Sequence, residues 1–199
     1  MSDARRLSDP RPLAVRLPPG AAVLARDLTP AVLGPLAALV RQRQLRLVIA
    51  GEGRLALAWR AGLHLPDRRP TRSLLPVLLA RRGRRPPLLS VAAHGRAGLA
   101  RARRLRADAV ILSPVFPTAS HPGAAALGPH RFAAIARRAG RPVIALGGVK
   151  ARSAKRLPPL AAGWAAVEGW AEEALCRLGH SVSRKSRRGR LHHGRPSAG

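Results

Sequence analysis

The sequence predicts an α/β protein built around a parallel sheet, and two observations carry this prediction. Short apolar runs alternate along the chain with Ala-, Leu- and Arg-rich stretches of helical length. The runs are continuously apolar and not alternately apolar and polar, which is typical of strands buried on both faces of a parallel sheet. This repetition favours a doubly wound sheet or a (β/α)8 barrel of the TIM type.

Seven strands can be placed in chain order, and a stretch of helical character follows most of them. The expected strands lie within Ala21–Ala25, Leu45–Gly51, Gly62–Pro66, Pro87–His94, Asp108–Val115, Arg141–Gly148 and Gly163–Gly169, the last centred on Ala165–Val167. The expected helices lie within Pro30–Gln44, Gly53–Ala61, Arg72–Gly83, Arg96–Ala107, Pro129–Gly140 and Trp170–Leu178.

A closed barrel needs an eighth strand, which would have to precede Ala21. The segment Pro12–Leu17 ("PLAVRL") could supply it, although prolines stand on both sides. The alternative is that the first strand is missing and that Met1 is an internal start. We therefore expect a barrel of the (β/α)8 type with a degenerate or missing first strand.

The chain length of 199 residues suits a single domain, which we place at residues 1–179. Residues 180–199 ("HSVSRKSRRGRLHHGRPSAG") have no acidic residue, six Lys or Arg and no apolar periodicity. Such a composition predicts a disordered basic tail.

Composition and charge exclude several classes of protein. No apolar run approaches the roughly 18 residues that cross a membrane, and "MSDARRLSDPRP" lacks the apolar centre of a signal peptide. Cys176 is the single cysteine, which excludes a disulfide within the chain. We expect a cytoplasmic protein that does not bind membranes. Formation of a homo-oligomer is compatible with the sequence.

The formal net charge of +28 invites a nucleic-acid function. The excess is nearly all arginine, and it is dispersed along the chain instead of forming one stripe with interleaved aromatic residues. We expect non-specific nucleic-acid binding only. A basic, nucleic-acid-associated barrel protein stays as an alternative.

The residues that follow the strands are the candidates for chemistry, because parallel α/β sheets bind ligands at the carboxyl ends of their strands. One strand runs into "ILSPVFPTASHPG" (Ile111–Gly123), where Thr118 and Ser120 offer hydroxyl groups between prolines. The next strand ends at Gly147 and Gly148, whose backbone N–H groups an anion can approach closely. Together the two loops predict a phosphate site.

Three segments in this order and spacing carry a resemblance to a known family. They are "SVAAH", "ADAVILSPVFPTASHPGAAALG" and "RPVIALGGV", with a weaker match at "GLHLPD". The chain resembles the thiamine-phosphate synthase family and its TenI-type thiazole tautomerase relatives, over roughly Ala21 to Gly169. The resemblance implies a (β/α)8 barrel that joins a phosphorylated pyrimidine to a phosphorylated thiazole with the help of Mg2+.

The resemblance also assigns binding residues. Arg26 stands at the family's pyrophosphate-binding arginine, and Thr118 and Ser120 stand at the hydroxyls of its phosphate loop. Gly147 and Gly148 match the family's thiazole-phosphate cup, and Gly169 lies near the other lip of that cup.

At other positions the chain departs from the family pattern. The loop lysine of synthases is His121 here, and the metal-binding carboxylates can only be Glu52 and Asp67. The tautomerase relative has a histidine where Pro114 stands, so His94 or His121 would have to transfer the proton. The catalytic candidates are therefore Arg26, His94 and His121. An active synthase and a relative without transferase activity that binds or isomerises a thiazole phosphate are both compatible with this set.

Overall fold

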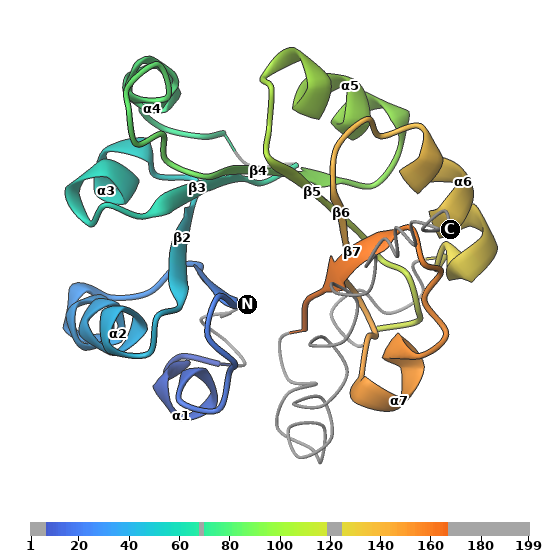
Figure 1. Ribbon diagram of the computed structural model, residues 1–199, viewed down its shortest axis with the longest axis horizontal. Coiled ribbons are helices and arrows are strands. Elements are labelled where there is room, and N and C mark those ends of the chain that lie inside the picture. The colour runs from blue at the N-terminus through green and yellow to red at the C-terminus, as the bar shows by residue number, and fades with distance from the viewer. Residues whose placement is uncertain (1–6, 68–69, 119–124, 167–199) are drawn as a thin grey trace, which may run out of the picture.

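The computed structural model describes residues 7–67, 70–118 and 125–166, and these residues form one parallel sheet of seven strands in chain order (Figure 1). The strands are β1 (Ala22–Ala25), β2 (Arg46–Ala50), β3 (Gly62–Leu65), β4 (Leu89–Ala93), β5 (Ala109–Leu112), β6 (Val143–Ala145) and β7 (Ala161–Trp164). The helices are α1 (Arg11–Ala14), α2 (Pro30–Gln42), α3 (Gly53–Ala58), α4 (Leu74–Ala80), α5 (Arg96–Arg104), α6 (Gly128–Arg137) and α7 (Ala151–Ala154).

The sheet curls into an open arc, with α2 to α6 along its outer side (Figure 1). β1 and β7 are the two ends of the sheet of described strands. The prediction of a TIM-type α/β barrel is thus confirmed, in the form of a curled half-barrel of seven strands.

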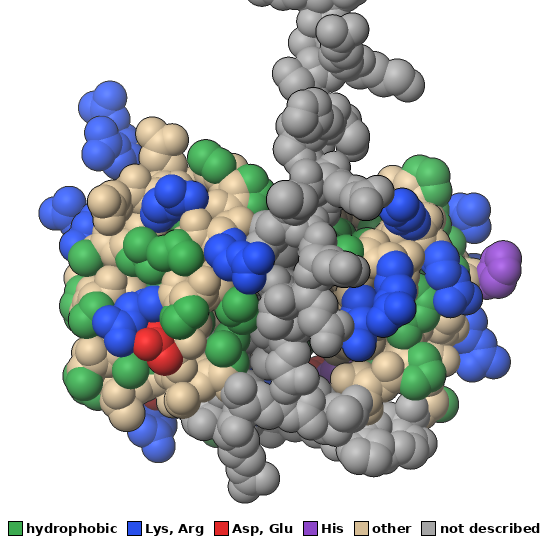
Figure 2. Space-filling model, turned by 90° about the horizontal axis from the view of Figure 1, so that it is seen from below, with side chains coloured by type: hydrophobic (Ala, Val, Ile, Leu, Met, Phe, Trp, Pro, Cys, Tyr) green, Lys and Arg blue, Asp and Glu red, His purple; other side chains and the backbone are tan. Residues whose placement is uncertain are grey.

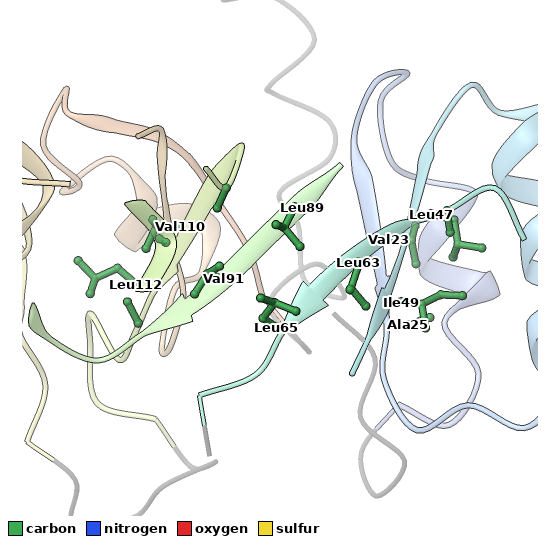
Figure 3. Close-up of a cluster of buried hydrophobic side chains, with 14 of the residues drawn as sticks. Val23, Ala25, Leu47, Ile49, Leu63, Leu65, Leu89, Val91, Val110 and Leu112 are labelled. Atoms are coloured by element: carbon green, nitrogen blue, oxygen red, sulfur yellow. The ribbon is translucent and has the colours of Figure 1, made fainter. Parts of the chain in front are cut away.

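The main core lies between the sheet and the outer helices (Figure 3). Alternate strand residues pair in rows across the sheet, as Val23 does with Leu47 and Leu63 with Leu89. α2 covers its part of the sheet with a buried stripe at helical spacing, made of Leu33, Leu36, Ala37 and Val40. The remaining strand residues point to the concave side, because successive side chains of a strand alternate between its faces.

Several concave-side residues are also buried, which explains the continuous apolar runs of the sequence. Leu24 and Val48 are 7% and 4% exposed, and the polar pair His64 and Ser90 is 6% and 5% exposed. His64 and Ser90 stand directly opposite each other on β3 and β4.

Of the two alternatives for the eighth strand, the one that places it at Pro12–Leu17 is excluded. Residues Arg11–Ala14 form the helix α1, which packs against α2. Asp9 lies just before this helix: its carboxylate accepts a hydrogen bond from the Arg11 backbone N–H at 3.0 Å and pairs with the Arg11 guanidinium at 2.8 Å. Proline is also compatible with a first helical turn, where backbone N–H groups have no intrahelical partner.

The expected position of the last strand is also wrong. β7 spans Ala161–Trp164 and pairs with β6, with Val143 opposite Ala161 and Ala145 opposite Trp164. The strand therefore ends before Ala165–Val167, and Val167 lies outside the described residues. The short helix α7, which the sequence did not predict, fills part of the connection between β6 and β7.

Positive charge is dispersed over the face of the molecule in Figure 2, as expected from the sequence. Figure 2 shows Lys and Arg side chains scattered over one face, with little acidic side chain among them. In the described part of the chain, no helix has both the length and the apolar character that a membrane crossing requires.

Candidate functional site at the carboxyl edge of the sheet

The parallel order of the strands brings their carboxyl ends to one edge. The candidate site residues follow the strands at this edge. They are Arg26 and Asp27 after β1, Glu52 after β2, Asp67 after β3, His94 after β4, Ser113 to Thr118 after β5, and Gly147 and Gly148 after β6. Of the predicted site residues, Ser120, His121 and Gly169 lie outside the described residues.

The loop after β5 is seated on the glycine pair after β6. The backbone N–H of Val115 donates to the Leu146 carbonyl at 2.9 Å, and that of Phe116 donates to the Gly147 carbonyl at 3.0 Å. A Cβ on Gly147 would lie 2.8 Å from the Cα of Pro114, and a Cβ on Gly148 would collide with the Pro117 carbonyl oxygen. Both glycines also have positive φ, +92° and +62°.

The glycine pair is therefore needed for the close approach of two loops. This gives the pair a structural role, and its role in binding phosphate stays a prediction. On its other side, the β5 loop accepts hydrogen bonds at the start of α6, from the Leu127 N–H to the Pro114 carbonyl at 3.0 Å and from the Gly128 N–H to Val115 at 2.9 Å. These contacts fix the path of the chain that leads to Thr118.

His94 connects the loops after β3, β4 and β5. Its Nδ1 lies 2.7 Å from the Ser113 carbonyl oxygen, to which it can only donate, and its Nε2 lies 3.8 Å from Oδ2 of Asp67. In the neutral ring this arrangement leaves the lone pair on Nε2, beside a carboxylate. The side chain is 43% exposed, so a ligand or solvent can reach the ring.

His64 is a second histidine near this edge, and the sequence reasoning did not select it. Its Nδ1 lies 2.9 Å from the Ser90 hydroxyl oxygen on the neighbouring strand. Burial lowers the pKa of His64 to about 4, and the positive charges of Arg26 and Arg101 act in the same direction. The ring is therefore neutral at physiological pH. The signal in the sequence that could have identified His64 is a histidine inside an otherwise apolar strand.

Two further cations reach this edge from outside the loops that the sequence reasoning considered. Arg101 extends from α5 and donates through Nη1 to the Pro66 carbonyl oxygen at 2.8 Å. The Arg156 guanidinium carbon lies 5.5 Å from the centre of the Phe116 ring, a cation–π distance. Long side chains that cross between loops cannot be placed from sequence spacing.

Each carboxylate that follows the first three strands has a basic partner. Asp27 lies 3.5 Å from Arg26, Glu52 lies 3.7 Å from Arg72, and Asp67 lies 3.8 Å from His94. The carboxylates are therefore distributed over three separate pairs.

The resemblance predicts Mg2+, which needs several oxygen ligands in near-octahedral geometry. Among residues 7–67, 70–118 and 125–166, no group of three or more Asp, Glu, His or Cys side chains could hold a metal ion. The two expected ligands, Glu52 and Asp67, belong to different ion pairs. The described donor groups therefore do not fit a metal held by the protein alone.

The curled sheet and the loop cluster at its carboxyl edge define a (β/α)-barrel-type protein with a candidate ligand site where such barrels bind their ligands. Residues 26–169, well over half of the chain, match the family described as thiamine monophosphate synthase. The chain belongs to this family.

Solved structures show the same fold. A thiamine phosphate pyrophosphorylase from Pyrococcus furiosus superposes with a TM-score of 0.68 at 20% sequence identity, covering 87% of each chain. A cube-shaped, highly porous protein cage, designed by fusing symmetric oligomeric domains, gives a TM-score of 0.57 at 14% identity. That match covers 85% of this chain and 60% of the cage chain. A search of curated proteins gave no match.

Proposed function

We propose that the chain is a thiamine-phosphate-synthase-like transferase. It would join a hydroxymethylpyrimidine pyrophosphate to a thiazole phosphate and release pyrophosphate. The observation that carries the proposal is the family match over residues 26–169, which spans every edge loop from Arg26 to Gly148. The β5 loop held on the glycine pair supports it, because that loop leads into the predicted phosphate-binding hydroxyls.

The reaction needs positive charge more than it needs a base. The bond between the pyrimidine methylene carbon and the pyrophosphate oxygen breaks, and its electron pair leaves with the pyrophosphate. The thiazole nitrogen then forms the new C–N bond to the resulting cation. Cationic groups that face the leaving oxygen lower the barrier, because they stabilise charge that grows in the transition state. Arg26 is the proposed group for this role.

The thiazole phosphate is proposed to bind at the loops after β5 and β6. Thr118 and Ser120 would donate hydroxyl hydrogen bonds, and the turn at Gly147 and Gly148 would bring backbone N–H groups close to the phosphate. His121 would add positive charge when it is protonated, in the place of the family's lysine. Gly169 is proposed at the opposite lip.

A second function is favoured by two observations at the edge. The carboxylates at the edge have basic partners, and His94 carries its Nε2 beside Asp67. A TenI-like member without transferase activity, which binds or isomerises a thiazole phosphate, would use a histidine of this kind to move a proton between ring atoms. No net redox change or co-reactant is needed for that step.

A transferase assay separates the two functions. Protein shown to be folded by circular dichroism is mixed with both substrates and Mg2+, and the product is oxidised to fluorescent thiochrome. Product that scales with protein concentration supports the synthase. Folded protein that binds thiazole phosphate in calorimetry but forms no product supports the TenI-like function instead.

A further inference from the structure

The pair of Glu52 and Arg72 is built by the backbone and does not depend on side-chain contact alone. The segment before α4 returns over the loop that follows β2. The Arg72 N–H donates to the Gly51 carbonyl at 2.8 Å, and the Gly53 N–H donates to the Arg72 carbonyl at 2.9 Å. A Cβ on Gly53 would collide with the Ser73 carbonyl oxygen, so the two segments lie in direct contact.

This backbone bridge places a cation where the family resemblance expects a metal-binding loop. The Arg72 Nε lies 3.7 Å from Oε1 of Glu52, longer than a hydrogen bond. The Arg72 side chain is 82% exposed and that of Glu52 is 41% exposed. Exposed ion pairs of this length are weak, so a stronger anion can replace the carboxylate as the partner of the guanidinium.

We propose that Arg72 binds the pyrophosphate group of the substrate directly, an inference that rests on the proposed function. Arg72 would do so at the place where the family pattern has a metal ligand. Glu52 is then the counter-ion of Arg72 in the free protein, and the arriving pyrophosphate displaces it. A guanidinium suits this exchange, because its planar N–H groups bind phosphate oxygens in pairs. Binding of pyrophosphate consequently does not depend on a divalent metal.

The two roles of Glu52 predict opposite effects of one substitution. If Glu52 is a counter-ion, Glu52→Gln removes a competitor and strengthens pyrophosphate binding. If Glu52 is a metal ligand, the same change weakens binding in Mg2+. Glu52→Gln is close in shape to the original residue, so the sign of the effect reports on charge and not on packing.

The test is isothermal titration of the full chain with inorganic pyrophosphate, in EDTA and in Mg2+ at matched ionic strength. We expect binding in EDTA that is about tenfold weaker in Arg72→Gln and about threefold stronger in Glu52→Gln. Arg72→Lys keeps the charge without the planar fork and should give an intermediate affinity. As a control, Arg85→Gln removes the same charge from the segment between α4 and β4, at the amino end of β4. This variant should bind pyrophosphate with unchanged affinity.

Three results would overturn the inference. The first is binding that requires Mg2+ and is weakened by Glu52→Gln, which would assign Glu52 to a metal. The second is binding of pyrophosphate in EDTA that Arg72→Gln leaves unchanged. The third is that pyrophosphate does not bind under any condition. The proposed transferase function is judged separately, by thiochrome formation and by binding of thiazole phosphate, so either idea can fail without the other.

Discussion

At the scale of single residues, the buried His64 makes stability depend on pH. Its pKa is about 4 in the folded protein, because burial disfavours the charged ring, against an ordinary value of 6.5. Between these values the unfolded chain binds a proton that the folded chain does not. Stability is therefore complete above about pH 6.5 and falls as the pH drops toward about 4.

We expect the free energy of unfolding to be roughly 2 kcal/mol lower at about pH 5 than at about pH 7.5 on account of His64. Urea denaturation at the two pH values measures this difference. In His64→Gln, which has no titratable ring at this position, most of the difference should disappear. An equal loss of stability in both proteins would assign the pH dependence to other histidines.

The same histidine shows what sequence reasoning could not reach. A continuous apolar run predicted β3 correctly, but the run gave no register against β4. Only the register places the Ser90 hydroxyl opposite His64. The pairing of His94 with Asp67, across two loops, is likewise a product of the strand order and not of any local spacing.

At the scale of elements, Arg81 connects the end of α4 to β4 and β5. Its guanidinium donates to the carbonyl oxygens of Pro87 and Arg106 at 2.6 and 2.9 Å. It also bonds both carboxylate oxygens of Asp108, at 2.6 and 3.1 Å. One Asp108 oxygen in turn accepts from the Leu89 N–H at 2.7 Å. These contacts hold the amino ends of two strands to a helix.

Arg81→Ala should lower the free energy of unfolding by about 2 kcal/mol, reduced from the sum of its hydrogen bonds because Asp108 is partly exposed. Arg82→Ala, at the exposed neighbouring position, should change stability by less than about 0.5 kcal/mol. Chemical denaturation of both variants measures the contrast. Similar values for the two would mean that solvent screens the Arg81 network.

The turn after β6 supports a prediction with a close control. Gly148 and Gly140 have nearly the same φ, +62° and +61°. A Cβ on Gly148 meets the backbone of Pro117 and Phe116, whereas a Cβ on Gly140 has only the Arg103 side chain at 4.0 Å. Alanine at either position adopts an unfavourable left-handed conformation, but only at Gly148 must a second loop also move.

We expect Gly140→Ala to cost about 1 kcal/mol of stability and Gly148→Ala to cost at least about 2 kcal/mol. Displacement of the β5 loop should also abolish binding of thiazole phosphate in Gly148→Ala alone. Thermal denaturation and calorimetry of the two variants test this. If Gly148→Ala bound the ligand normally, the seating of the β5 loop would have no part in the site.

Helices were predicted from the sequence where they were long enough to show their periodicity and were missed where they were shorter. The helical spacing of Leu33, Leu36 and Val40 made α2 recognisable. α1 and α7 have four residues each, too few to show a period. β7 ("AAGW") contains a glycine and small alanines, which gave no reason to prefer it over the more apolar residues that follow.

At the scale of the whole molecule, the net charge of +28 competes with the local site for anions. A chain of this charge attracts any polyanion, and the affinity of such binding falls steeply with salt because counterions are released from the nucleic acid. Binding of one phosphorylated small molecule in a site has no comparable counterion release. Salt dependence therefore separates the two kinds of binding in one protein.

The predicted basic tail, residues 180–199, supplies six of these charges and lies outside the described residues. A variant ending at residue 179 should bind RNA more weakly, with a log–log salt slope smaller by up to about five, since each phosphate contact contributes about 0.7 to 0.9. Its affinity for thiazole phosphate should not change, because the proposed phosphate loops are at the sheet edge. If removing the tail abolished thiazole-phosphate binding, the tail would belong to the site. If full-length protein kept tight, saturable RNA binding at high salt, the basic barrel would have a nucleic-acid function that the dispersed Lys and Arg side chains of Figure 2 do not predict.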